Sequence, residues 1–280
     1  MKKKRKIWSI IYHIIVCGIG FIMIYPLLWM FISSFKHTNQ IFLTADQLIP
    51  VEPTLENYIN GWKGFAGISF SVFFRNSGFI TIIATLGAVL SSAVVAYGFA
   101  RCRFKTRKIL FTCMLLSMML HYQIIMIPQY IWFKRLNWID TYLPLIVPFY
   151  FGQAFFIFMI MQFVQGIPRE LDEAAKIDGC SIYGIFIQII MPLITPALIT
   201  SMIFSFIWRW DDFLAPLLYL SKPSAYPVSI ALKLFSDPSS SSDYGAMFAM
   251  SSLSVLPAIL IFIFFQKYLM EGVSHSGLKG

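Results

Sequence analysis

The chain has 280 residues, of which 58% are hydrophobic and only 12% are charged, and its mean hydropathy is +0.72. A water-soluble domain of this length needs far more polar surface, so the composition excludes the soluble classes and predicts an integral membrane protein. The net charge of +9 raises nucleic acid as a partner, but the cations flank apolar runs, which argues against nucleic acid and favours anchoring at anionic lipid.

Six stretches lack Asp, Glu, Lys and Arg and are long enough for a spanning helix, which takes about 20 apolar residues. The first run is too long for a signal peptide and lacks a small-residue cleavage site, so we interpret it as a retained helix. Only helices or closed barrels satisfy their backbone in lipid, and these runs do not alternate as barrel strands do. The sequence therefore predicts an all-α, polytopic membrane protein, one domain over 1–280, with six transmembrane helices at about 8–33, 76–99, 109–131, 142–164, 193–218 and 246–268.

The small residues of the second predicted helix indicate a central place in the bundle, because they let helix backbones approach closely. If the N-terminus lies inside and the six helices alternate, the inner segments hold 14 Lys and Arg residues and the outer loops hold seven. The positive-inside rule then predicts both termini in the cytoplasm.

The stretch 170–192, ELDEAAKIDGCSIYGIFIQIIMP, is a charged insert in this apolar chain. Pro168 suits the start of a helix, acids in a first turn suit the helix dipole, and Gly179 suits a helix stop. Apolar residues at helical spacing then lead to Pro192. The residues predict a helix, a glycine turn and a second helix on the inner side of the membrane, over 168–192. Two interpretations are open: an interfacial helix pair packed under the bundle, or a protrusion that docks a soluble partner.

The spacing of this insert resembles the EAA motif of ABC-importer permeases. Glu173, Ala174 and Ala175 are followed after three residues by Gly179, and then by IIMP at 189–192, where Met191 replaces the usual leucine. The likeness extends over nearly the whole chain to the smaller, maltose-permease-like subunit of carbohydrate importers. It is carried by YPLLWMFISSFK, FRNS at 74–77, AYGFARCRFKTRK, FKRLNWIDTY and the tail QKYLMEGVSHSGLKG.

This resemblance implies a type I ABC-importer permease in the bacterial cell membrane that carries a sugar or oligosaccharide. It implies three kinds of protein partner besides the bilayer: a second homologous permease, two ATP-binding subunits and an extracellular solute-binding protein. It implies no nucleic acid. The helices of the motif would enter a cleft on the ATPase, with a polar contact from Glu173 and a sharp turn at Gly179, and the tail Ser274–Gly280 would reach the same interface. The residues assigned to ATPase coupling are Glu173, Ala174, Ala175, Asp178, Gly179 and Pro192.

The residues themselves predict that the chain is not an enzyme and holds no cofactor or metal. No G-x-x-x-x-G-K-[ST] sequence is present to cradle nucleotide phosphates, so ATP and Mg²⁺ would be bound by the partner ATPase. The four cysteines and four histidines show no ligand spacing, and no catalytic constellation is apparent. Two alternatives to the sugar importer stay open: the same machine for another solute, such as glycerol phosphate, and a non-ABC membrane enzyme or signalling protein.

The stretch FIWRWDDFLAPLL at 206–218 places ionisable groups in the outer half of the fifth predicted helix. Such groups usually face a pathway or each other, and Arg209 and Asp212 are three residues apart, so they either pair or line a pathway. Aromatic side chains here suit sugar stacking or the membrane interface. Arg209 also raises the hypothesis of an acidic saccharide. The candidate pathway residues are Arg209, Trp210, Asp211, Asp212, Tyr122 and Gln123, although the last two could instead hydrogen-bond neighbouring helices.

Overall fold

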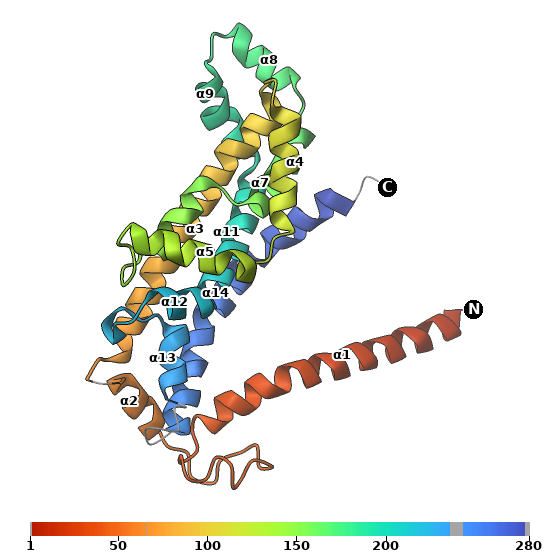
Figure 1. The fold of residues 1–280 in the computed structure, drawn as a ribbon. Coiled ribbons are helices and arrows are strands. Elements are labelled where there is room, and N and C mark those ends of the chain that lie inside the picture. Colours follow the sequence, from red (N-terminus) through yellow and green to blue (C-terminus); the bar gives the residue numbers. More distant parts are fainter. Residues whose placement is uncertain (1, 66, 236–242, 278–280) are drawn as a thin grey trace. The chain divides into compact units, whose positions relative to one another are not determined.

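A computed structural model describes residues 2–65, 67–235 and 243–277 of the chain (Figure 1). Within these ranges the chain is helical and forms no β-strand, only one isolated bridge between Phe65 and Ile68. The chain divides into two compact units, Met1–Ser71 with Ala231–Val255, and Val72–Ile230 with Leu256–Gly280. The predicted role of the tail Ser274–Gly280 falls in part outside the described residues, which end at 277.

The helices follow one another through connections that are mostly short. Their bounds are α1 Lys2–Ser33, α2 Glu56–Lys63, α3 Phe70–Arg101, α4 Arg107–Met118, α5 Tyr122–Arg135, α6 Leu143–Ile146, the 3₁₀ helix η1 Val147–Phe151, α7 Ala154–Gly166, α8 Glu170–Ile177, α9 Ile182–Ile185, the π-helix η2 Phe186–Ile190, α10 Met191–Leu193, α11 Thr195–Trp210, α12 Leu214–Tyr219, the 3₁₀ helix η3 Pro223–Ala225, α13 Val228–Leu234 and α14 Tyr244–Gly277.

The predicted polytopic helical fold is confirmed. Four segments are long and apolar enough to cross a membrane: Ile11–Ser33, Phe70–Arg101, Leu143–Gly166 and Tyr244–Tyr268. Two further helix pairs pass the same test but are sharply bent, α4 with α5 by 103° and Ile182–Leu193 with α11 by 75°. Counting each bent pair as one span gives six, which agrees with the number expected.

Three predicted spans differ in detail from the helices that form. The 109–131 span breaks between Met118 and Tyr122, because His121 adopts an extended backbone with φ −67° and ψ 138°. The 142–164 span is α6, η1 and α7, since two prolines and Gly152, at φ +82°, interrupt it. The 193–218 span ends at Trp210, and α12 is a separate helix.

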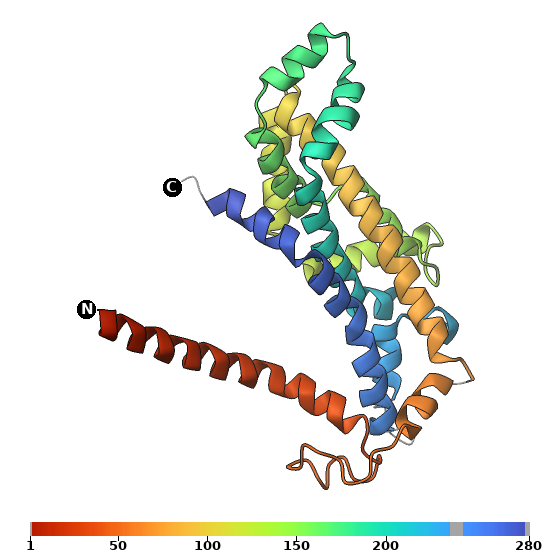
Figure 2. The same ribbon diagram turned by 180° about the vertical axis from the view of Figure 1, so that it is seen from behind.

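Helix α3 is the centre of the larger unit, as its small residues predicted. More than half of its most apolar window, 56%, is buried, against 28% for Leu143–Gly166. Ala88, Ala93 and Ala96 are fully buried and pack in one core with side chains of α7 and α11. Figures 1 and 2 show these three helices side by side from opposite directions. Close packing of small side chains gives this helix a rigid hold on its neighbours.

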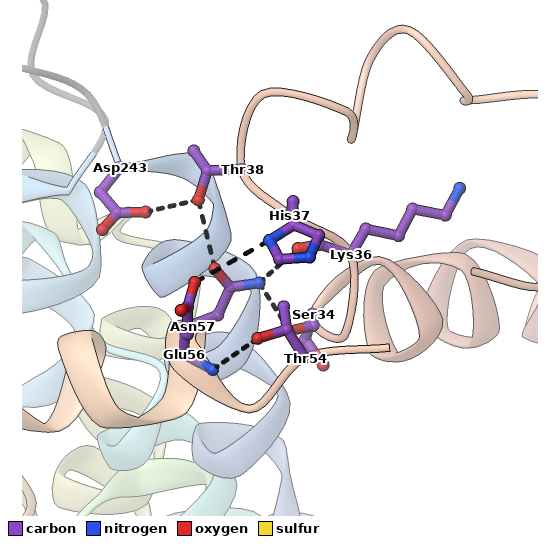
Figure 3. Close-up of polar contacts among 8 residues, drawn as sticks. All are labelled: Ser34, Lys36, His37, Thr38, Thr54, Glu56, Asn57 and Asp243. Carbon is purple, nitrogen blue, oxygen red and sulfur yellow. Dashed lines mark hydrogen bonds and ion pairs between the residues drawn. The ribbon is translucent and has the colours of Figure 1, made fainter. Parts of the chain in front are cut away.

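The smaller unit is organised around the buried amide of Asn57 in α2 (Figure 3). The Asn57 amide nitrogen donates to the backbone carbonyls of Ser34 and Lys36 at 2.8 and 2.7 Å. The Thr38 hydroxyl lies 3.2 Å from the Asn57 side-chain oxygen and 3.3 Å from a carboxylate oxygen of Asp243. These contacts tie the end of α1, α2 and the start of α14 together within this unit.

Candidate functional site: an anchored helix elbow and a polar cavity

The segment 168–192 forms the expected elbow of helix, glycine turn and helix. Helix α8 ends in a Schellman turn, in which the N–H of Gly179 donates to the Lys176 carbonyl at 3.0 Å and that of Cys180 to the Ala175 carbonyl at 2.9 Å. Gly179 has φ +82°, and a Cβ built on it would meet nothing within 4 Å. The position therefore requires glycine for its backbone conformation rather than for space. The Ser181 hydroxyl then accepts from the Gly184 N–H at 3.1 Å and caps α9.

The residues assigned to coupling lie on two different faces of α8. Ala175 is buried against the core of the larger unit, whereas Glu173, Ala174 and Asp178 are exposed, as is Gly179 in the turn. Pro192 is exposed in α10, at the far end of the elbow. The exposed set presents two carboxylates beside a small side chain, a surface that a protein partner can approach closely.

The last turn of α3 holds the elbow through a buried ion pair. The Arg101 guanidinium lies 2.9 Å from the Asp172 carboxylate, and these side chains are only 7% and 10% exposed. Arg101 also donates to the Ile167 carbonyl at 2.7 Å, just before α8. Neither partner was singled out by the sequence analysis. In the sequence, Arg101 was explained as one of the cations that orient the protein in the membrane, and Asp172 as an acid in the first turn of a helix. Neither explanation predicts that the two residues contact each other.

Tyr97, one helical turn before Arg101, holds the second arm of the elbow. Its hydroxyl lies 3.4 Å from the Ile182 carbonyl, and its ring lies 4.9 Å from that of Phe186, centroid to centroid. The two arms of the elbow therefore contact the same end of α3.

A π-helix, η2, connects α9 to α10 and α11. In a π-helix the hydrogen bonds run from residue i to i+5, so residues five apart approach the same face. Ile185 and Ile190, on either side of this wide turn, are both buried, and so is Ile194 four residues later. The π-turn thus keeps one continuous apolar face against the core through the second arm.

A cavity of about 750 Å³ lies among α4, α5, η1, α7 and α11 in the larger unit. Its wall is mostly apolar and carries a few polar groups. Three of the predicted pathway residues line it, Tyr122, Arg209 and Asp212, together with Trp208, Gln129 and Gln153. The other three do not. Trp210 is buried and stacks on Phe206, and Asp211 and Gln123 are exposed away from the lining.

Arg209 and Asp212 do not form the ion pair that their spacing allowed. Neither of the two ion pairs within 4.0 Å among the described residues joins them. The Arg209 guanidinium carbon lies 3.7 Å from the centre of the Phe149 ring, and its Nε is buried without a hydrogen-bond partner in the described structure. One Asp212 carboxylate oxygen accepts from the Ala215 N–H at 3.2 Å. Both side chains line the cavity without pairing with each other.

The break between α4 and α5 opens on the same cavity. Ser117, Met118, Leu120 and Tyr122, which flank the break, all line it. Non-helical backbone at membrane depth is tolerated only where it is buried in protein or lines a water-filled space. The break in this span is therefore consistent with its place at the wall of the cavity.

The described residues contain no group of three or more His, Cys, Asp and Glu side chains that could hold a metal ion. The four cysteines are free thiols; Cys17 and Cys113 are exposed, and Cys102 and Cys180 are half-buried.

Long apolar helices, bent spans around a cavity with a few polar groups and an anchored elbow define a multi-spanning helical membrane protein. The chain belongs to the family of binding-protein-dependent transport system inner membrane components, which it matches over residues 88–275. That range includes both the elbow and the residues of the cavity.

Curated relatives cover almost the whole chain. The arabinooligosaccharides transport system permease protein AraQ of Halalkalibacterium halodurans is 32% identical over 99% of this chain and 100% of its own length. The trehalose/maltose transport system permease protein MalG of Thermococcus litoralis is 30% identical over 92% of each chain. The galactooligosaccharides transport system permease protein GanQ of Bacillus subtilis is 30% identical over 100% of this chain and 99% of its own.

A solved structure shares the fold. It is the crystal structure of a bacterial ABC transporter involved in the import of the acidic polysaccharide alginate. One of its chains superposes with a TM-score of 0.82 over 94% of this chain and 96% of its own, at 21% sequence identity. This likeness confirms the expected ABC-importer permease fold.

Proposed function

We propose that this chain is a permease subunit of an ATP-driven importer that passes a sugar or oligosaccharide across the bacterial cell membrane. The observation that carries the proposal is the elbow at 168–192, which has EAA spacing, an exposed Glu173 and a buried anchor to α3. The names of the relatives support saccharides as the cargo.

The elbow is the contact for a separate ATPase in this proposal. A stiff protrusion can transmit movement only if it is fixed to the helices that must move, and the Arg101–Asp172 pair supplies that fixation. Two ATP-binding subunits, which hold ATP and Mg²⁺, would grip the elbow of this chain and that of a second, homologous permease. The nucleotide then favours one of two bundle states through its differential affinity for them.

The orientation follows from the charge distribution along the chain. The segments assigned to the inner side hold 14 Lys and Arg residues against seven in the outer loops, which supports a cytoplasmic elbow and cytoplasmic termini. An extracellular solute-binding protein would deliver the cargo to the opposite side.

The cavity is our candidate for this subunit's part of the sugar pathway. Its volume of about 750 Å³ is in the range of small-molecule sites, roughly 300–1,000 Å³. Trp208 offers a ring face for stacking, Arg209 offers donors and Asp212 an acceptor, the groups that bind sugar hydroxyls. We retain Tyr122, Arg209 and Asp212 as pathway residues and add Trp208.

Reconstitution tests the function directly. The chain is co-expressed with its partner permease, ATPase and solute-binding protein, and ATP-dependent uptake of a labelled oligosaccharide into vesicles is measured. We expect Glu173→Lys to abolish uptake and Glu170→Lys, an equally exposed carboxylate on α8, to leave most of it. Absence of a nucleotide-binding protein from the purified complex, or uptake that proceeds without ATP, would refute the proposal.

The cargo is tested with an Arg209→Ala variant and three labelled solutes, a neutral oligosaccharide, an acidic oligosaccharide and glycerol phosphate. Selective loss of the acidic oligosaccharide would assign Arg209 to a carboxylate, and equal loss of both saccharides would remove that idea. ATP-driven uptake of glycerol phosphate alone would support an ATP-driven importer but would overturn the assignment of a sugar as its cargo.

A further inference from the structure

A second cavity, of about 480 Å³, lies where α3 turns into α4 and faces α7. Four cationic side chains and one amide provide its polar groups, and no acidic residue lines it. The lining residues are Arg103, Phe104, Lys105, Arg107, Lys108, Phe111, Met161 and Gln165. This cavity shares no lining residue with the cavity that contains Arg209.

The positive charge of this cavity has no counterion among its lining residues. Neither of the two ion pairs among the described residues involves any of its four cations. Helix α4 adds to the imbalance, because its first turn contains Arg107 and Lys108 and no acid. The Thr106 side chain makes no capping hydrogen bond to the helix. Two cations at the positive end of an uncapped helix repel that end, so an anion bound there would be favoured by the side chains and the helix alike.

The position of the cavity points to a lipid. The spanning helix α3 ends at Arg101 and the next spanning segment begins at Arg107, so the residues between them lie at a membrane boundary. The apolar part of the wall is aromatic: the rings of Phe104 and Phe111 lie 6.0 and 5.8 Å from that of Phe99, centroid to centroid. A cavity that joins cations to an apolar wall at this depth matches a phosphate group attached to acyl chains.

We propose that this cavity is a binding site for an anionic phospholipid. The headgroup phosphate lies among Arg103, Lys105, Arg107 and Lys108, and the upper part of an acyl chain lies against Phe104, Phe111 and Met161. A diffuse attraction of cations to an anionic surface needs no cavity. The grouping of four cations beside an apolar wall in one open cavity makes this a site for individual lipid molecules, and a free phosphate ion would use only the cationic part of it.

The test measures lipid retained by the purified transporter complex. The complex is prepared in neutral detergent, supplied with dioleoyl phosphatidylglycerol or dioleoyl phosphatidylcholine, and analysed by native mass spectrometry. We expect retention of phosphatidylglycerol in preference to phosphatidylcholine. The double variant Arg103→Gln/Arg107→Gln should reduce this retention at least tenfold. The control Lys134→Gln/Arg135→Gln removes two cations from the end of α5 and should leave retention unchanged.

Two further arms separate the alternatives. Inorganic phosphate at millimolar concentration should not displace the lipid; displacement would show a free-phosphate site and overturn the proposal. Equal loss in the two double variants would show diffuse attraction and overturn it too. If the glutamine variant fails to assemble, the unaltered complex is titrated with salt. Retention of phosphatidylglycerol should fall as the salt concentration rises, because salt screens the cations. Retention that does not change with salt concentration would refute the proposed site.

Discussion

The buried pair between Arg101 and Asp172 gives the sharpest prediction about coupling. Asp172→Asn keeps the size of the side chain and removes its charge, which leaves the Arg101 guanidinium buried with the Ile167 carbonyl as its remaining hydrogen-bond partner among the described residues. Removing one member of a buried pair costs about 3 to 5 kcal/mol, whereas an exposed pair contributes about 0 to 1 kcal/mol. Because the two side chains are only 7% and 10% exposed, the buried range applies. We expect a cost near its lower end, because Arg101 keeps its hydrogen bond to the Ile167 carbonyl.

A cost of about 3 kcal/mol weakens the hold of α8 on α3 by roughly a hundredfold, since each 1.4 kcal/mol is a factor of ten. Amides of the turn at 178–180 should then exchange with solvent roughly a hundredfold faster in hydrogen-exchange experiments. A movement of the elbow would then displace α3 less. We therefore expect less sugar imported per ATP hydrolysed in reconstituted vesicles, with ATP hydrolysis itself retained.

The control is Glu170→Gln, which makes the same chemical change at an exposed position of the same helix and should alter neither measurement. Exchanging the charges, Arg101→Asp with Asp172→Arg, should restore part of the coupling. The reasoning fails if Asp172→Asn retains the unaltered ratio of transport to hydrolysis and unaltered exchange at 178–180.

Three more predictions follow from single contacts. Gly179→Ala forces an L-residue to φ +82°, at a cost of about 1 to 2 kcal/mol, although the added methyl group meets no other atom. ATP-driven uptake should therefore fall, and uptake at the unaltered rate would contradict this. Gly245→Ala places a methyl group against the Asn57 side chain and should destabilise the smaller unit by about 1 to 3 kcal/mol in thermal unfolding, whereas Gly78→Ala, with open space, should not. Tyr97→Phe removes the hydroxyl near the Ile182 carbonyl and keeps the ring contact, so coupling should decline by less than half; complete uncoupling would show that the hydroxyl is essential.

The spans could be predicted because the membrane imposes one requirement, a long apolar helix, that is visible in composition. The breaks were less predictable. Prolines and Gly152 signal the interruption between α6 and α7, but the residues from Met119 to His121 contain no proline or glycine. These three residues are exposed in the structure, and the sequence offers only a polar pair, His121 and Tyr122, as a hint of the break.

The elbow was predictable because its turn chemistry is local, and Gly179 takes the positive φ that a helix stop requires. The cavity was predicted only in part. Trp208 and Trp210 are two residues apart in one helix, and the sequence does not say which of them faces the interior space. Trp208 lines the cavity, and Trp210 is buried against Phe206. The contact between Arg101 and Asp172 joins residues far apart in the sequence, which no local pattern reveals.

The π-turn at 186–190 has a geometric consequence for the whole elbow. Each residue of an α-helix advances the chain by about 100° around the axis, so the extra residue in a π-turn sets the rotational phase of everything that precedes it relative to α11. Deleting one residue here would give the arm Ile182–Leu193 the ordinary pitch of an α-helix up to its bend before α11. It would also rotate α9, and α8 beyond it, by about 100° about the axis of this arm. Glu173 would then face a different direction. The direction in which the elbow faces thus depends on the one extra residue of the π-turn.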